Sequence, residues 1–400
     1  MSERGLAHPE LIAGSNPLLE AAAPFTTFRE WPEVLRSEPL EECDWRSIPP
    51  EWRSPLLDLS KHHYWPNRLV VDIADSIQTM LRGSLMARNP LSVAEQRRIN
   101  MLALSQKLED VPLQSLRIRD GGGIISAITG MGKSALLERT LAAIAPEQVV
   151  IHGRSEACGW SSLTQVMYLV IDAPSNGTRG GVLARIVEGM DTLLGTDYYR
   201  EYRKQRNLEA MVVFVAKMLS IHRVGLLAID ENQRENFGES FWLNSFVLFY
   251  LGLMNLGIPI LLLGNPMAFT NLEASAQVMR RFSAAGYHKM MPAATASEAW
   301  WAEDFIPGMC RFSLCEDNSA LPDILEKGFR FSAGVPGLFV PLWLEAQRLA
   351  LRRGGDTASV SIEDIDIASD SPRVEALVAV AEEISGATKG RFFEHSSCRW

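Results

Sequence analysis

The stretch GIISAITGMGKSALLE, residues 123–138, decides how this chain folds. Its first part, Gly123–Ile128, is an apolar run that predicts a buried β-strand, and a helical pattern begins at Ala135. Between them lies a loop with glycine at positions 130 and 132, followed by Lys133 and Ser134. Glycines let backbone N–H groups curl around an anion, and the start of the next helix adds its positive end. This order of strand, loop and helix predicts a phosphate-binding loop.

The loop is predicted to hold ATP with Mg²⁺. Lys133 would reach the β- and γ-phosphates, and the Ser134 hydroxyl would be a Mg²⁺ ligand. The full motif has glycine six residues before the lysine, where this chain has Ala127, a small residue that can still fit. A glycine-rich turn without a ligand is the alternative. The residues expected to contact the nucleotide are Thr129, Gly130, Met131, Gly132, Lys133, Ser134 and Ala135.

A second motif lies downstream, where the apolar run Leu226–Ile229 leads directly into Asp230 and Glu231. This pattern predicts a buried strand that ends at the nucleotide. Asp230 would hold Mg²⁺ through water, and Glu231 would polarise the attacking water. Many strands end in acids, but after a phosphate-binding loop the pair predicts ATP hydrolysis. P-loop kinases and many GTPases usually lack the second carboxylate.

Two further features match roles known in AAA+ ATPases. Asn265 follows the apolar run Ile258–Leu263 and could orient the lytic water, although an Asx-type turn before Pro266 is the alternative. Arg280 and Arg281 end a helical run and could reach the γ-phosphate held by a neighbouring copy. A solvated arginine pair is the competing interpretation. If the first is right, the site is complete only between subunits, which predicts a ring or filament of this chain.

An ordered set of segments resembles the TnsC/TniB family of AAA+ transposition ATPases. Each segment is weak alone, and their order along roughly residues 15–370 carries the resemblance. The segments are Asn16–Glu20, Leu81–Gly83 with Arg88–Pro90, Gly132–Ser134, Gln165–Pro174, Leu194–Tyr198, Gly225–Gln233, Ile258–Gly264, Arg280–Phe282, Ser332–Gly337 and Leu342–Ala350. The chain departs from the family pattern at Ala127 and Asn232. Its lid motif also contains no arginine, so that only Arg330, just upstream, is left for a second-sensor role.

The resemblance implies a nucleotide-switched scaffold in the bacterial cytoplasm. Family members bind ATP and Mg²⁺, oligomerise on double-stranded DNA, and connect a TniQ/TnsD-type targeting protein to a TnsA/TnsB-type transposase. ATP binding builds the assembly and hydrolysis dismantles it. Two other functions stay open: a replication-initiator or helicase-loader-like AAA+ ATPase, and a P-loop signalling switch that does not use DNA.

DNA contacts are expected at two basic places. Thr178 and Arg179 follow a polar, glycine-rich loop and precede a helix, whose N-terminus could face phosphates. Arg203 and Lys204 lie in a second basic run, which a solvated helix face explains equally well. The net charge of -9 argues against a simple DNA-coating protein. The excess acid is at the two ends of the chain, so a local basic surface in the middle is compatible with it.

Composition indicates a globular chain without a membrane span. The 400 residues are 47% hydrophobic and 22% charged, which fits one large domain with smaller additions. Five scattered cysteines have no metal-ligand spacing and indicate reduced cytosolic thiols. No signal peptide is expected at the N-terminus. The uncharged run 241–264 is interrupted by Asn244, Asn255 and Pro259, and is interpreted as a buried helix followed by a buried strand.

Strand-like runs alternate with helical stretches from residue 123 onwards, which predicts a parallel sheet covered by helices. The expected fold class is α/β: an AAA+ P-loop domain with a small C-terminal helical lid and an N-terminal extension. The expected parts are a Pro/Trp-rich partner-docking extension (1–66), the nucleotide-binding domain with leading helices (67–295), the helical lid (296–385) and a flexible tail (386–400). Expected strands are Gly123–Ile128, Gln148–His152, Gln165–Ile171, Val224–Ile229 and Ile258–Leu263, and expected long helices are Gly181–Leu194 and Tyr198–His222.

Overall fold

A computed structural model describes residues 14–105, 121–174, 178–232, 240–273, 276–315, 321–354 and 358–388. The chain divides into two compact units, which are described separately. The sheet unit comprises Met1–Thr27, Ile73–Ile128 and Lys133–Lys289, and the helical unit comprises Phe28–Asp72, Thr129–Gly132 and Met290–Trp400. The boundaries expected at residues 66, 295 and 385 stay a prediction.

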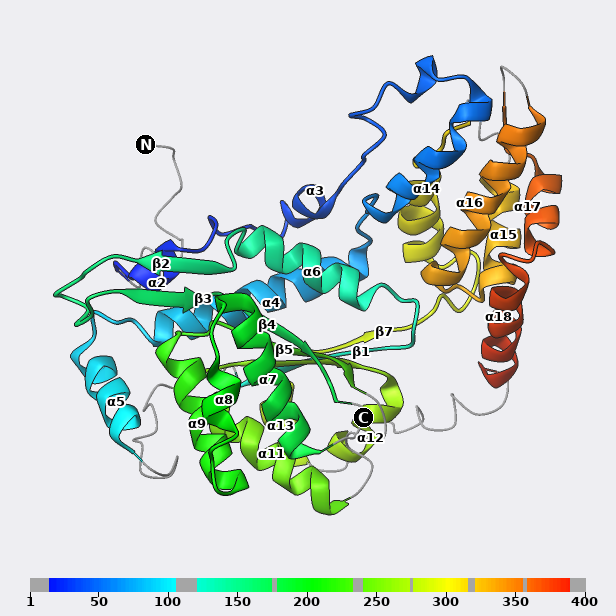
Figure 1. Cartoon of the computed structure of the whole chain (residues 1–400). Helices are drawn as coiled ribbons and strands as arrows, with labels where there is room; N and C mark the ends of the chain where they lie inside the picture. The colour runs from blue at the N-terminus through cyan, green and yellow to red at the C-terminus, as the bar shows by residue number, and fades with distance from the viewer. Residues whose placement is uncertain are drawn as a thin grey trace. The chain divides into compact units, whose positions relative to one another are not determined.

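The sheet unit is built on five strands in the order β4-β5-β6-β1-β7 (Figure 1). These are β4 (Leu169–Asp172), β5 (Leu227–Asn232), β6 (Ile260–Gly264), β1 (Gly122–Ala127) and β7 (Tyr287–Met290). The pairs β4–β5, β5–β6 and β6–β1 are parallel. Every residue of β1 and β6 is buried, as expected for strands covered on both faces. The predicted α/β class is confirmed.

Helices cover both faces of this sheet. Figure 1 shows α4 (Arg68–Ala87) and α6 (Lys133–Ile144) on one face, with α7 (Arg179–Leu194), α9 (Leu208–Ile221) and α11 (Ser240–Asn255) on the other. The second group shares one apolar core with the inner strands, which includes Ile186, Leu219, Leu253 and Leu262. Smaller elements of the same unit are α2 (Pro17–Glu20), α5 (Val93–Leu104), α8 (Tyr198–Tyr202), α12 (Pro266–Glu273) and α13 (Ala276–Phe282).

Two predicted strands differ from the structure, and one strand was not predicted. The run Gln148–His152 forms β2 (Val149–His152), which pairs with β3 (Leu163–Val166) in a separate antiparallel ribbon. The predicted strand Gln165–Ile171 is divided between β3 and β4, because two adjacent apolar runs looked continuous. β7 was not predicted, since its four residues YHKM include two polar ones.

The predicted long helix Tyr198–His222 is two helices, α8 and α9. The Asn207 side chain accepts a hydrogen bond from the Ala210 backbone N–H at 2.8 Å and caps the start of α9. Asparagine is a strong N-cap residue, so this start signal was present in the sequence.

The helical unit combines the Pro/Trp-rich segment with the C-terminal helices. Its main helices are α3 (Trp31–Leu35), α14 (Ile306–Cys310), α15 (Leu321–Ser332), α16 (Pro336–Arg353), α17 (Ile362–Ser369) and α18 (Glu375–Thr388). The Pro/Trp-rich segment forms short 3₁₀ turns at Trp45–Ser47, Pro50–Trp52 and Ser54–Lys61.

Part of this segment packs on its own chain. Trp31 and Trp45 are buried, and the Arg53 guanidinium donates to the carbonyls of Ile48 at 2.7 Å and Leu314 at 3.2 Å. Trp52 is instead 70% exposed. Partner docking by residues 1–66 therefore stays a prediction, for which Trp52 is accessible and Trp31 and Trp45 are not.

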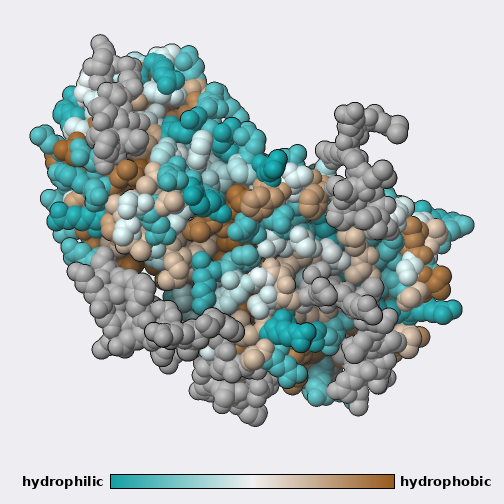
Figure 2. Space-filling model, turned by 180° about the vertical axis from the view of Figure 1, so that it is seen from behind, coloured by the Kyte–Doolittle hydropathy of each residue, from teal (hydrophilic) through white to brown (hydrophobic). Residues whose placement is uncertain are grey.

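Apolar and hydrophilic residues are interspersed on the molecular face drawn in Figure 2. Among the helices that the structure describes, none combines the length and apolar character needed to cross a bilayer. The run 241–264 contains α11 followed by β6, which is the predicted order of helix and strand. Of the expected tail 386–400, the first three residues continue α18 (Glu375–Thr388), and residues 389–400 lie outside the described residues, as do Ser175–Gly177 and Gln233.

Candidate nucleotide-binding site

The phosphate-binding loop lies between the end of β1 at Ala127 and the start of α6 at Lys133. Gly130 has φ 89° and Gly132 has φ 82°, a left-handed conformation that costs glycine little and other residues much more. Ala127 is fully buried and does not have a positive φ. Alanine therefore fits where the motif has its first glycine.

Lys133 places its ammonium group at the end of β1. Its Nζ donates to the carbonyls of Ala127 at 2.9 Å and Ile128 at 3.2 Å. Burial lowers the pKa of Lys133, while the carboxylates of Asp230 and Glu231 oppose that shift. A half-buried cation with two acids within electrostatic reach is a suitable counter-charge for phosphate oxygens.

The fold brings the two predicted Mg²⁺ ligands into direct contact. The Ser134 hydroxyl donates to Asp230 Oδ2 at 2.6 Å, although the residues are 96 positions apart in the sequence. Asp230 is 6% exposed, and its Oδ1 accepts the Glu231 N–H at 2.7 Å. A hydroxyl and a carboxylate are hard oxygen donors of the kind that Mg²⁺ uses when phosphates and waters complete its shell. The residues present fit Mg²⁺ held together with a nucleotide.

Glu231 has an unusual backbone conformation. Its φ is 55°, and the pairing of β5 with β6 shifts register between Ile229 and Asn232. A left-handed glutamate costs about 1–3 kcal/mol, and such outliers cluster at functional sites. The irregularity releases Glu231 from the regular alternation of the strand, and the residue is exposed. Its carboxylate is thus accessible to solvent beside the buried Asp230.

Asn265 follows β6, the strand that lies between β1 and β5. Because the three strands are parallel, their carboxyl ends meet at one edge of the sheet. The Asn265 Oδ1 accepts the Met267 N–H at 3.1 Å, which is the geometry of the Asx-turn alternative. The water-orienting role stays a prediction.

The two candidate arginines differ in their surroundings. Arg281 is half-buried, and its Nη2 donates to Asn255 Oδ1 at 2.6 Å. Arg280, one position earlier on α13, is exposed. The structure therefore ties Arg281 to the end of α11 and leaves Arg280 accessible to another molecule.

The two expected DNA-contact places lie close together. Thr178 caps α7, because its Oγ1 accepts the Gly181 N–H at 3.1 Å, and Arg179 is the first helical residue. The Tyr202 hydroxyl donates to the Gly180 carbonyl at 3.3 Å. This contact joins the start of α7 to the end of α8, where Arg203 and Lys204 are exposed. Lys204 forms an ion pair with Glu201 at 2.5 Å.

The sequence did not predict a contact between the phosphate-binding loop and Gly337. In the helical unit, which includes Thr129–Gly132, the Gly337 N–H donates to the Gly130 carbonyl at 2.8 Å. A Cβ added at Gly337 would lie 2.7 Å from the Gly130 Cα, so only glycine fits. The motif Ser332–Gly337 was recognised, but its contact with the phosphate-binding loop was not. Arg330, the second-sensor candidate, is exposed, and its role stays a prediction.

Neither a family model nor a curated protein matches this sequence. Among solved structures, the chain is similar to Cdc6p from Pyrobaculum aerophilum, with 14% identity, a TM-score of 0.40, and coverage of 70% of this chain and 67% of that one. It is also similar to the Walker-type ATPase Paby2304 of Pyrococcus abyssi, with 13% identity, a TM-score of 0.36, and coverage of 72% and 80%. At TM-scores this low, these likenesses carry no argument about function. The α/β fold class is shown by the parallel sheet and by the glycine-containing loop between β1 and α6.

Proposed function

We propose that this chain is an AAA+ ATPase that regulates DNA transposition. The observation that carries the ATPase part is the Ser134–Asp230 hydrogen bond at 2.6 Å. It unites a helix-start hydroxyl and a strand-end carboxylate beside the ammonium of Lys133. A nucleoside triphosphate with Mg²⁺ requires such groups: oxygen ligands for the metal ion and a cation for the phosphates.

Each residue has a distinct role in the proposed hydrolysis. The backbone N–H groups around Gly130 and Gly132 and the start of α6 bind phosphate oxygens. Lys133 neutralises charge on the β- and γ-phosphates, and Ser134 with Asp230 would hold Mg²⁺, which supplies Lewis-acid charge when bound. Glu231 orients the attacking water and accepts its proton.

Self-assembly is proposed because Arg280 is exposed. An arginine presented to a neighbouring copy would stabilise charge on that copy's γ-phosphate in the transition state. ATP binding would then favour a ring or filament, and hydrolysis would dismantle it.

The transposition role is supported by the ordered motif set that resembles TnsC/TniB. The proposed partners are double-stranded DNA, further copies of this chain, a TniQ/TnsD-type targeting protein and a TnsA/TnsB-type transposase. The proposed DNA-binding surface includes Thr178, Arg179, Arg203 and Lys204. Binding at such a surface depends on phosphate charge, so the affinity for DNA should fall steeply as the salt concentration rises.

Negative-stain microscopy with duplex DNA tests this proposal. Rings or filaments on DNA that need a slowly hydrolysed ATP analogue, and that Lys133→Ala abolishes, would support it. Duplex unwinding coupled to ATP turnover would favour the helicase-loader alternative instead. A chain that binds ATP but ignores DNA under all salt conditions would leave a P-loop switch without DNA.

A further inference from the structure

A buried cluster of charged residues lies where α4 ends at Ala87 and α5 begins at Val93, a junction called here the α4–α5 elbow. It consists of Arg88, Glu95, Arg98 and Arg223, which are 1%, 4%, 5% and 5% exposed. The cluster therefore combines three guanidinium groups with a single carboxylate, and these four side chains carry two net positive charges. Buried charge without a counter-charge is strongly unfavourable, so the source of compensation is a structural question.

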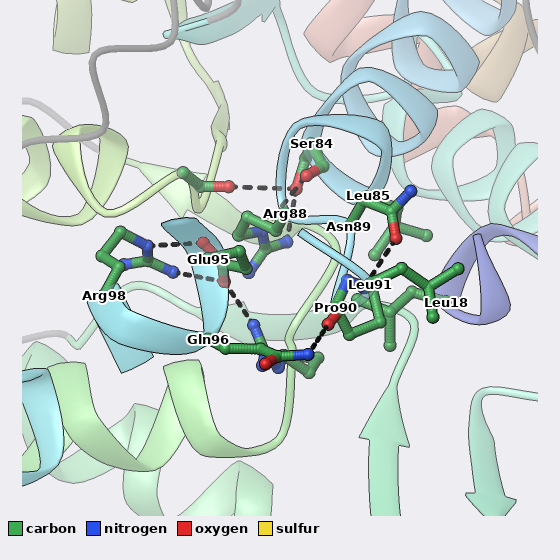
Figure 3. Close-up of polar contacts among 12 residues, drawn as sticks. Leu18, Ser84, Leu85, Arg88, Asn89, Pro90, Leu91, Glu95, Gln96 and Arg98 are labelled. Atoms are coloured by element: carbon green, nitrogen blue, oxygen red, sulfur yellow. Dashed lines mark hydrogen bonds and ion pairs between the residues drawn. The ribbon is translucent and has the colours of Figure 1, made fainter. Parts of the chain in front are cut away.

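Glu95 compensates only part of this charge (Figure 3). Arg98 forms a bidentate ion pair with Glu95, in which Nε donates to Oε2 at 2.7 Å and Nη2 donates to Oε1 at 2.8 Å. Arg223 also donates to Oε1 of Glu95. Both carboxylate oxygens are thus occupied by two of the three arginines.

Arg88 has only neutral acceptors among the described residues. Its Nη2 donates to the Val224 carbonyl at 2.7 Å and to the Ser84 hydroxyl, and its Nε donates to the Ser84 carbonyl at 3.2 Å. Burial lowers the pKa of Arg88 to about 9; attraction to Glu95 opposes this shift, and repulsion from Arg98 and Arg223 adds to it. The three guanidiniums are therefore within electrostatic reach of one another.

Two donor groups of the cluster have no acceptor in the described part of the chain. They are Nη1 of Arg88 and Nη1 of Arg98, both buried. A buried donor without a partner is unfavourable because it has lost its hydrogen bonds to water, and the cost is larger when the group is charged. An anion bound within the cluster would supply an acceptor for such a donor and a counter-charge for the excess guanidinium groups.

We propose that this arginine cluster binds a small monovalent inorganic anion such as chloride. Burial of 95% or more at every member excludes a large ligand. The site is separate from the nucleotide site: Arg88 contacts the Val224 carbonyl ahead of β5, and Ser84 donates to the Gly257 carbonyl ahead of β6 at 3.0 Å. Asp230 lies near the carboxyl end of β5, and Asn265 follows the carboxyl end of β6. The anion would hold the α4–α5 elbow against the amino-terminal ends of β5 and β6.

Thermal unfolding of the full chain in sodium chloride and in sodium gluconate, at equal ionic strength, tests the proposal. Gluconate is too large for the cluster, so Tm should be about 2–4 °C higher in chloride, with saturation as chloride is raised. Arg98→Gln should abolish the difference because it removes a donor and a charge. Arg97→Gln, at an exposed position on the same helix, should retain it.

Chloride NMR line widths provide a second measurement that does not depend on a variant folding. The wild-type chain should broaden the chloride signal in a saturable way. Equal Tm in both salts together with no broadening would overturn the proposal. A chloride effect that persists in folded Arg98→Gln would also overturn it, because the anion would then bind elsewhere.

Discussion

Glu231 lies beside Asp230 in a strained conformation, with φ 55°. Replacing it with glutamine keeps the shape but removes the proposed base, so Glu231→Gln should bind ATP normally and lose about 10²-fold or more of its hydrolysis rate. Nucleotide binding and steady-state phosphate release measure the two effects. Glu156→Gln, an exposed acid elsewhere in the sheet unit, is the matched control. Normal turnover in Glu231→Gln would refute the role given to this carboxylate.

The neighbouring arginines 280 and 281 should give opposite phenotypes. Arg281→Ala removes a charged hydrogen bond to Asn255 and should lower the free energy of unfolding by about 1.5–3 kcal/mol. Arg280→Ala removes an exposed side chain and should leave Tm unchanged, while the ATPase rate of the assembled protein falls by about 10³-fold. Urea unfolding and ATPase assays on both variants separate the roles. A stable Arg281→Ala with lost activity would reverse the assignment.

At the level of elements, the segment Asn16–Glu20, which is part of the TnsC/TniB resemblance, has a structural role: it forms α2 and anchors it to α4. Asn16 is 2% exposed; its Oδ1 accepts the Leu18 N–H at 3.1 Å, and its Nδ2 donates to the Leu85 carbonyl on α4 at 2.9 Å. Asn16→Ala should therefore lower the free energy of unfolding by about 1–3 kcal/mol. Ser15→Ala, which loses only an exposed hydrogen bond to Glu20, should have little effect. Equal urea midpoints for the two variants would contradict this anchoring role.

At the level of the whole molecule, alkylation of Cys310 and Cys315 should occur only when the helical unit unfolds. Burial raises the pKa of Cys310 and of Cys315 to about 12, from an ordinary value of 9.0. Both thiols are therefore protonated at pH 8, and both are inaccessible. They should resist alkylation in the native protein and react on denaturation, while the half-buried Cys43 reacts before either of them. Mass spectrometry of peptides after timed alkylation measures this order, and rapid native labelling of Cys310 would contradict it.

The sequence alone determined the parts of the site that are local in the chain. A phosphate-binding loop needs glycines at left-handed positions between a strand and a helix, and Gly130 and Gly132 have that conformation. The acids after an apolar run located the carboxyl-terminal part of β5, because a buried strand is apolar until it approaches the edge of the sheet. The strand itself was expected at Val224–Ile229 and is found at Leu227–Asn232, so that it includes both acids. These requirements act over a few residues, so they are visible in the order of residue types.

Tertiary structure decided what depends on distant residues. It brought Ser134 to Asp230, separated the surroundings of Arg280 and Arg281, and placed the Gly337 N–H on the Gly130 carbonyl. It also gathered Arg88 and Arg223 around Glu95, which no spacing in the sequence indicates. These contacts join segments that local propensity does not relate, because burial and hydrogen bonding select them only once the sheet and its helices have packed.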